Sequence, residues 1–523
     1  MRSPVISVST AARSLVLTAA FLGGCGSASY TPLATPYYAA AAPPPMAAAS
    51  VTAAEPASMA ESKKSEDYKD YGVNPTVDPA KDRLSTFAID VDTASYTISR
   101  RKIMEGELPP REAVRVEEFL NYFDYGYEGP KPDAAAPFAV HLDAAPSPFV
   151  TGHHLIRVGI QAKRLAQQER KPVHLVYLVD TSGSMQSPDK IGLARKSLRL
   201  LTESLHQGDT VALCTYAGST REVLPPTGVE RRGEILAAID QLNAGGSTAM
   251  ESGLQIAYRL ASLSRVSGHV NRVVVLSDGD ANVGATTHGD ILKSIRHYKD
   301  EGITLSTVGF GNGNYKDTMM EQLADQGDGN YSYIDSEAQA RRVFSEQVSS
   351  VLEVIARDVK VQVEFDPTVV KQYRVVGYEN RDIADRDFRN DQVDAGEIGA
   401  GHSVTAVYDV VLKSTTSSPI TVRLRHKAPA PSAAPAIETV FAMSPARNSP
   451  SFEAAPASLR FAAAVTEFGE ILRQSPHARG VTLAHVEQVA RAAALPRVDQ
   501  QEFLGLVRKA DTLSGGKALA VAR

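Results

Sequence analysis

The middle of the chain alternates between short apolar runs and longer segments with helical periodicity. Val173–Val179 is almost continuously apolar, as expected of a strand buried on both faces of a sheet. From Ile191 to Leu205 apolar residues recur at the spacing of an amphipathic helix. The same criteria predict strands at 211–214, 273–276, 303–308 and 331–334, and helices at 235–242, 254–263, 291–298, 318–324 and 337–355. Strands that alternate with helices favour a doubly wound, Rossmann-like α/β domain, whose ligands bind at the carboxyl ends of the strands.

The regions that flank this unit show a different period. Apolar residues alternate with polar ones at Val359, Val361, Val363 and Phe365, which is typical of a half-buried strand. Similar stretches lie at 137–144, 154–162, 403–413 and 420–426. We therefore predict a β-sandwich built from residues 81–168 and 358–450, with the α/β domain of residues 169–357 inserted into it. Residues 451–515 have helical spacing and predict a small C-terminal helical subdomain.

The N-terminus has the features of an export signal. Two arginines precede a short apolar run that ends in Leu22-Gly23-Gly24-Cys25, and the run is too short to cross a bilayer. This ending resembles a bacterial lipobox, which implies cleavage before Cys25 and acylation of that residue. Because Gly26 rather than Asp follows, the resemblance implies the outer membrane, at its periplasmic face or the cell surface. The alternative is an ordinary signal peptide that happens to contain Cys25.

Composition narrows the classes of protein that remain. The chain has 523 residues, a net charge of −5 and 43% hydrophobic residues, which excludes a mostly disordered chain and a multi-span membrane protein. The acidic balance disfavours nucleic-acid binding. Residues 26–80 are rich in Ala, Pro and Ser and predict a flexible tether. Of the two cysteines, Cys214 lies in an apolar strand, so we expect a buried thiol and no disulfide.

Three short polar motifs follow or precede elements of the α/β unit. Asp180-x-Ser182-x-Ser184 follows the first strand, Gly-Gly-Ser-Thr248 precedes a helix, and Leu-Ser-Asp278-Gly ends another strand. Together they offer hydroxyl and carboxylate oxygens, the donors that Mg²⁺ prefers, with Mn²⁺ and Ca²⁺ as alternatives. We expect the hydroxyls to bind directly and the carboxylates to orient waters or act from a second shell. The alternative is that these turns only cap helices.

This set of motifs resembles the von Willebrand factor type A (VWA) domain and its metal-ion-dependent adhesion site. The family pattern of D-x-S-x-S, then a threonine, then an aspartate is complete at Asp180, Ser182, Ser184, Thr248 and Asp278. The resemblance implies metal-dependent binding of a protein ligand, whose carboxylate completes the coordination, and it implies no catalysis. The last helix of the family, here about 337–355, often shifts when ligand binds.

The flanks resemble a bacterial family of VWA lipoproteins of the YfbK type, and the resemblance extends over residues 64–515. It is carried by Ser85–Tyr96, Leu108-Pro109-Pro110, Glu117–Tyr125, Ala356–Phe365, Tyr378–Arg381 and Asp394–His402.

Other motifs suggest competing chemistry. Asp90-Val-Asp92-Thr93 is similar to the nucleophile loop of haloacid-dehalogenase phosphatases, but its threonine comes one place too early. Four acidic residues, Asp387, Asp391, Asp394 and Glu397, suggest either a Ca²⁺ site or a solvated acidic loop. Gly309-Phe-Gly311 lacks the rest of a dinucleotide-binding loop and indicates a turn.

We therefore expect a membrane-anchored module that binds a protein partner through a divalent metal at the cell envelope, and not an enzyme. Two alternatives remain: an envelope scaffold whose metal is purely structural, and a metal-dependent phosphohydrolase that uses Asp90 and Asp92. The oligomeric state is not predicted.

Overall fold

The inserted domain is built on a mainly parallel sheet. The structure, a computed structural model, describes residues 66–131, 134, 136–165, 170–279, 288–312, 315–429 and 434–516. The sheet has the order β6-β5-β4-β7-β8-β9, in which only β6 is antiparallel to its neighbour. Its strands are β4 (Val173–Asp180), β5 (Thr210–Tyr216), β6 (Thr220–Gly228), β7 (Val270–Ser277), β8 (Ile303–Phe310) and β9 (Tyr331–Ile334).

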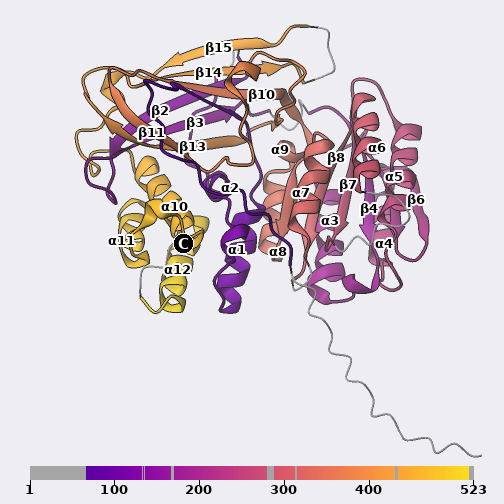
Figure 1. Ribbon diagram of the computed structural model, residues 1–523. Coiled ribbons are helices and arrows are strands. Elements are labelled where there is room, and N and C mark those ends of the chain that lie inside the picture. The colour runs from indigo at the N-terminus through magenta and orange to yellow at the C-terminus, as the bar shows by residue number, and fades with distance from the viewer. Residues whose placement is uncertain are drawn as a thin grey trace, which may run out of the picture. The chain divides into compact units, whose positions relative to one another are not determined.

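Helices cover both faces of this sheet (Figure 1). β4 is buried at every position, and its alternate side chains enter two separate cores. Leu175 and Tyr177 pack with α3 (Leu193–Glu203) and α4 (Arg232–Asp240), whereas Val176 and Leu178 pack with the helices of the opposite face. Those helices are α5 (Met250–Ser264), α6 (His288–Asp300) and α7 (Asp317–Gln326). The continuous apolar pattern of β4 thus reflects burial from both sides.

Two antiparallel sheets form a sandwich from chain on both sides of the inserted domain. One has the order β1-β10-β14-β15, with β12 also paired to β10, and the other has the order β11-β13-β3-β2. β1 from before the insertion pairs with β10 from after it, and β3 likewise pairs with β13. The bounds are β1 (Leu84–Ala88), β2 (Phe138–Pro146), β3 (His154–Ala162), β10 (Val354–Phe365), β11 (Val370–Val376), β12 (Ile398–Gly399), β13 (Ser403–Leu412), β14 (Ile420–Lys427) and β15 (Ile437–Ala442). The predicted fold class, an α/β domain inserted in a β-sandwich, is confirmed.

A helical subdomain packs around a cluster of aromatic rings. It contains α10 (Ala457–Leu472), α11 (Leu483–Ala493) and α12 (Val498–Leu513). Phe123 contacts Phe461 and Phe503 edge-on, with ring centroids 5.2 and 5.4 Å apart, a favourable arrangement for aromatic pairs. Residues 81–168 therefore contribute more than the predicted strands, because α1 (Ala94–Glu105) and α2 (Val116–Tyr122) join this helical core.

Two predicted boundaries need correction. The predicted tether extends to residue 80, but Glu66 already pairs with Arg101 at 2.7 Å, and Val77 forms backbone hydrogen bonds with Tyr373. Only residues 26–65 of the predicted tether lie outside the described residues. The predicted helix 337–355 is broken into α8 (Glu337–Arg341), a π-helical turn at Arg342–Glu346 and α9 (Val348–Leu352). The helix ends at Leu352 and β10 begins at Val354, and close to this end Arg272 donates a hydrogen bond to the Val351 carbonyl.

The predicted anchor, Cys25, lies outside the described residues. Cys214 is a buried free thiol in β5, as predicted, and burial raises the pKa of its thiol to about 12. Within the described ranges, the helices are all too short or too polar to cross a membrane.

Candidate metal centre

Three loops meet at the carboxyl ends of β4 and β7. Asp180 is the last residue of β4, and Asp278 directly follows β7. The loop that carries Thr248 is tied to the first loop, because Gly183 N donates to Gly246 O at 2.9 Å and Gly245 N donates to Thr181 O at 2.7 Å. The backbone therefore brings all three predicted motifs to one end of the sheet.

Asp180 is completely buried and is surrounded by hydrogen-bond donors. Its Oδ1 accepts from Ser182 N at 2.8 Å, and its Oδ2 accepts from Ser277 Oγ at 2.9 Å and Tyr216 OH at 3.2 Å. Burial, with a smaller contribution from the charge of Asp278, raises the pKa of Asp180 to about 6, although these hydrogen bonds oppose the shift. Because both oxygens are engaged by the protein, Asp180 suits a second-shell role that orients its neighbours.

The two serine hydroxyls have the separation that a small octahedral ion requires. Ser182 Oγ and Ser184 Oγ lie 2.9 Å apart. Adjacent oxygens on Mg²⁺, each bound at 2.0–2.1 Å, stand about 2.9–3.0 Å apart. The donor chemistry and this spacing fit a divalent cation held by Ser182, Ser184 and Thr248, with Asp180 and Asp278 supplying charge. The assignment of these five residues as metal ligands stays a prediction.

A lysine that the motifs did not indicate reaches this site. Lys190 Nζ lies 2.9 Å from Asp278 Oδ2, and both side chains are buried. The stem of Lys190 crosses Gly311, where an added Cβ would stand 2.2 Å from Lys190 Cε. Gly311 also has a φ of +78°, which glycine adopts without strain. The Gly309-Phe-Gly311 turn therefore makes room for a buried side chain.

The two aspartates of the phosphatase-like motif lie elsewhere. Asp90 and Asp92 are both buried, and Arg381 lies 3.6 and 3.3 Å from their carboxylates. Asp92 Oδ1 also accepts a hydrogen bond from Tyr331 N at 2.9 Å. These contacts make the pair part of the joint between the chain before the insertion, the inserted domain and the loop around Arg381.

The acidic loop is only partly a cluster. Asp394 and Glu397 meet Asp328, but Lys299 Nζ lies 2.6 Å from Asp394 and 2.9 Å from Asp328. Asp391 instead pairs with Arg425 and Asp387 accepts from Asn390, so the four predicted residues do not converge on one point. Lysine and arginine side chains thus supply the counter-charges of this loop.

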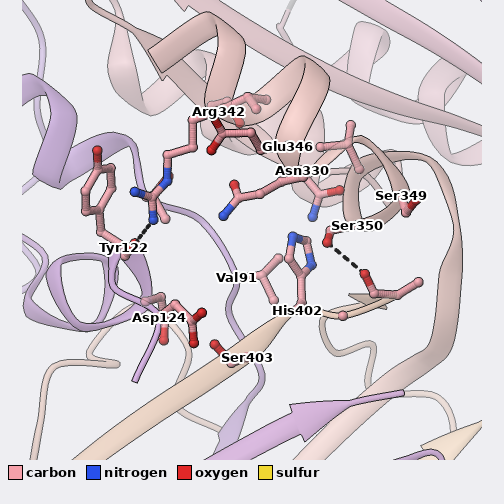
Figure 2. Close-up of a pocket in the computed structure, with 18 of the residues that line it drawn as sticks. Val91, Tyr122, Asp124, Asn330, Arg342, Glu346, Ser349, Ser350, His402 and Ser403 are labelled. Carbon is pink, nitrogen blue, oxygen red and sulfur yellow. Dashed lines mark hydrogen bonds between the residues drawn. The ribbon is translucent and has the colours of Figure 1, made fainter. Parts of the chain in front are cut away.

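A separate cavity of about 380 Å³ lies near the amino-terminal end of β9 (Figure 2). Arg342, Asn330 and His402 point into it, and Ser350 at its side donates to Ala400 O at 2.7 Å. No local pattern in the sequence indicates this cavity, because its lining comes from both flanks and from the broken last helix. The metal centre lies at the carboxyl ends of the strands, whereas this cavity lies at the amino-terminal end of β9. The two features are therefore at opposite ends of the parallel strands.

His402 makes the stability of this region depend on pH. Burial, with a contribution from Arg272, lowers the pKa of His402 to about 4, whereas an unfolded histidine titrates near 6.5. As pH falls from 7 to 4, the unfolded chain takes up a proton that the folded chain does not, which lowers the free energy of unfolding by about 3 kcal/mol at most. His402→Asn should remove this loss, so the variant gains on the wild type as pH falls in urea denaturation.

The exposed His297, on α6, provides the matched control. His297→Asn should follow the wild-type pH profile. A profile of His402→Asn parallel to the wild type between pH 7 and 4 would contradict the buried, neutral histidine.

Comparison with known proteins places the chain in a family. The family profile described as "von Willebrand factor type A domain" matches residues 174–347, and "von Willebrand factor" matches 62–157. "Uncharacterized protein YfbK, C-terminal" matches 350–421 and 413–513. A von Willebrand factor type A protein from Catenulispora acidiphila is similar in structure, with a TM-score of 0.43 and 17% identity over 72% of this chain and 91% of that one.

Two curated relatives match in sequence. The uncharacterized protein sll0103 of Synechocystis is 25% identical over 240 residues, which is 45% of this chain and 55% of the relative. The uncharacterized protein YfbK of Escherichia coli (strain K12) is 37% identical over 471 residues, which is 85% of this chain and 81% of the relative. With this extent of identity and with a VWA domain in its middle, the chain belongs to the YfbK family of bacterial VWA proteins.

Proposed function

We propose that this protein is an envelope lipoprotein that captures a protein partner through a divalent metal ion. VWA domains are commonly protein-interaction modules with a metal-ion-dependent adhesion site. In this chain Ser182, Ser184 and Thr248 would hold Mg²⁺ directly, while Asp180 and Asp278 would orient waters around it from a second shell. The ion itself would supply an electrophilic position for a carboxylate of the partner.

The observation that carries this proposal is the pair of serine hydroxyls beside a buried carboxylate. Ser182 Oγ and Ser184 Oγ lie 2.9 Å apart, and the backbone between them is fixed by Asp180 and Gly246. Three neutral hydroxyls neutralise none of the charge of a divalent ion. Such an ion retains a strong attraction for an incoming anion, which favours a binding role over a closed structural site.

The anchored location rests on the lipobox-like ending at Cys25 and on the Ala/Pro/Ser-rich residues that follow. Several acyl chains on one cysteine would hold the protein stably at a membrane, since each buried CH₂ contributes about 0.8 kcal/mol. The proposed site is the outer membrane. The mass of the mature N-terminal peptide tests this part independently, because acylation adds a fixed mass to Cys25.

Capture from envelope extracts tests the binding role. The full chain, immobilised in detergent, should retain a defined partner in Mg²⁺ and release it in EDTA. Replacement of Ser182 by alanine should reduce capture in Mg²⁺ to the level seen in EDTA. Capture that is the same with and without metal would overturn the proposal.

The two alternatives give different outcomes. If the metal is purely structural, EDTA will lower the melting temperature as loss of a bound ligand requires, and capture will not follow the metal. If Asp90 and Asp92 form a phosphohydrolase, a generic phosphomonoester will be cleaved and Asp90→Asn will abolish that cleavage.

A further inference from the structure

A buried lysine from the turn before α3 forms an ion pair with one carboxylate of the predicted metal centre. Lys190 belongs to a short π-helical turn, Pro188–Gly192, which lies between the Asp180–Ser184 loop and α3. Its ammonium nitrogen is 2.9 Å from Asp278 Oδ2, and the side chains of Lys190 and Asp278 are 8% and 0% exposed. Such a contact is a charge-assisted hydrogen bond in a region that excludes bulk water.

The methylene groups of Lys190 are also held in place by packing. They pack against the backbone of Gly311, and the Gly311 carbonyl accepts hydrogen bonds from Arg101 at 2.7 Å and from Tyr333. Arg101 is in turn paired with Glu66. The side chain of Lys190 thus lies in a narrow space between the loops that carry Asp180 and Asp278 and the first described residues of the chain.

We propose that Lys190 is an internal cation that competes with the divalent metal for Asp278. This inference rests on the proposed metal site and adds its regulation. In the lysine-paired state, the positive charge that Asp278 needs when buried comes from Lys190. In the metal-loaded state it comes from the ion, whose two positive charges repel the ammonium of Lys190 from the carboxylate.

The two states have a direct consequence for loading. Metal must displace an existing ion pair. The apparent affinity for the metal is therefore the intrinsic affinity multiplied by the fraction of molecules in which Asp278 is not paired with Lys190. The same pair stabilises the metal-free loops, because a buried carboxylate without a partner is costly. Lys190 therefore lets the chain remain folded without metal and restricts loading, and with it partner capture, to higher concentrations of divalent cation.

Titration of the full chain with Mn²⁺ alone, by calorimetry, tests this inference. Lys190→Met should bind Mn²⁺ with a dissociation constant at least tenfold lower than that of the wild type. Lys190→Gln, which keeps a hydrogen-bond donor near Asp278 without the charge, should show the same direction. Lys196→Met is the matched control, since Lys196 lies on α3 and is 59% exposed; it should change the constant less than twofold.

Melting temperature gives a second readout. In EDTA, Lys190→Met should melt below the wild type, and saturating Mn²⁺ should raise its melting temperature by more than it raises that of the wild type. If Mn²⁺ binds the wild type and both Lys190 variants equally, the competition is wrong while the metal site stands. If Mn²⁺ binds none of the three proteins, the metal site and this inference both fail.

Discussion

Replacing Ser182 and Ser184 together with alanine is expected to weaken Mn²⁺ or Mg²⁺ binding at least a hundredfold. The two hydroxyls are the predicted direct ligands, and removal of even an outer-shell partner of a metal site typically costs about 10–100-fold in affinity. Because Ser182 Oγ and Ser184 Oγ bond to each other, their joint removal leaves no buried donor without its partner in that pair. Calorimetric titration with the metal gives the affinity directly.

The same loop supplies a matched control. Ser187 lies three residues beyond Ser184, and its hydroxyl has no hydrogen-bond partner among the described residues. Ser187→Ala should leave the dissociation constant within about twofold of the wild type. In EDTA, the double serine variant should melt within a few degrees of the wild type. An unchanged metal affinity in the double variant would exclude the two hydroxyls as ligands.

The aspartates should behave differently from the serines. Asp180→Ala combined with Asp278→Ala is expected to abolish metal-dependent capture and also to lower stability without metal. The reason is that Ser277 and Tyr216 lose their shared acceptor on Asp180, and Lys190 loses its buried counter-charge. The serine variant should therefore lose metal affinity but keep its stability in EDTA, whereas the aspartate variant should lose both.

The parts of the fold that local patterns encode were predictable. β4 is recognisable because burial on both faces requires an unbroken apolar run, and the metal motifs are recognisable because each lies within a few residues of a strand end. β6 was missed because Pro225 and Pro226 disfavour a strand, yet a sheet edge tolerates them.

Features that depend on distant partners were not predictable. Lys190 at the start of a helix has the pattern of a solvated residue, and only the fold brings it to Asp278, 88 positions away. Near the end of the last helix, the Val351 carbonyl accepts a hydrogen bond from Arg272, which lies 79 positions earlier in the chain. The cavity in Figure 2 likewise draws its lining from segments on both sides of the insertion. Periodicity cannot report such contacts, because it records only which face of an element is apolar.

Arg381→Ala is expected to produce the largest loss of stability, about 3–5 kcal/mol. The guanidinium pairs with Asp325 at 2.8 Å and with Asp92 at 3.3 Å, and Asp90 lies 3.6 Å away. Asp90 and Asp92 are almost fully buried, so loss of Arg381 leaves two neighbouring carboxylates without their counter-charge. Burial, followed by the charge of Asp90, already raises the pKa of Asp92, and Arg381 opposes both effects.

Urea denaturation of the full chain measures this loss, and the same loop offers a control. Arg386 is 88% exposed, and its contact with Asp387 is long, at 3.9 Å. Arg386→Ala should therefore change the free energy of unfolding by less than about 0.5 kcal/mol. Asp90→Asn with Asp92→Asn in the Arg381→Ala background should recover part of the loss, because amides avoid the cost of burying two charges. A loss in Arg381→Ala no larger than in Arg386→Ala would mean that solvent, rather than Arg381, balances the aspartates. The joint between the inserted domain and its flanks would then depend on its other contacts, which include the buried pairs Arg115–Asp317 and Arg100–Asp335.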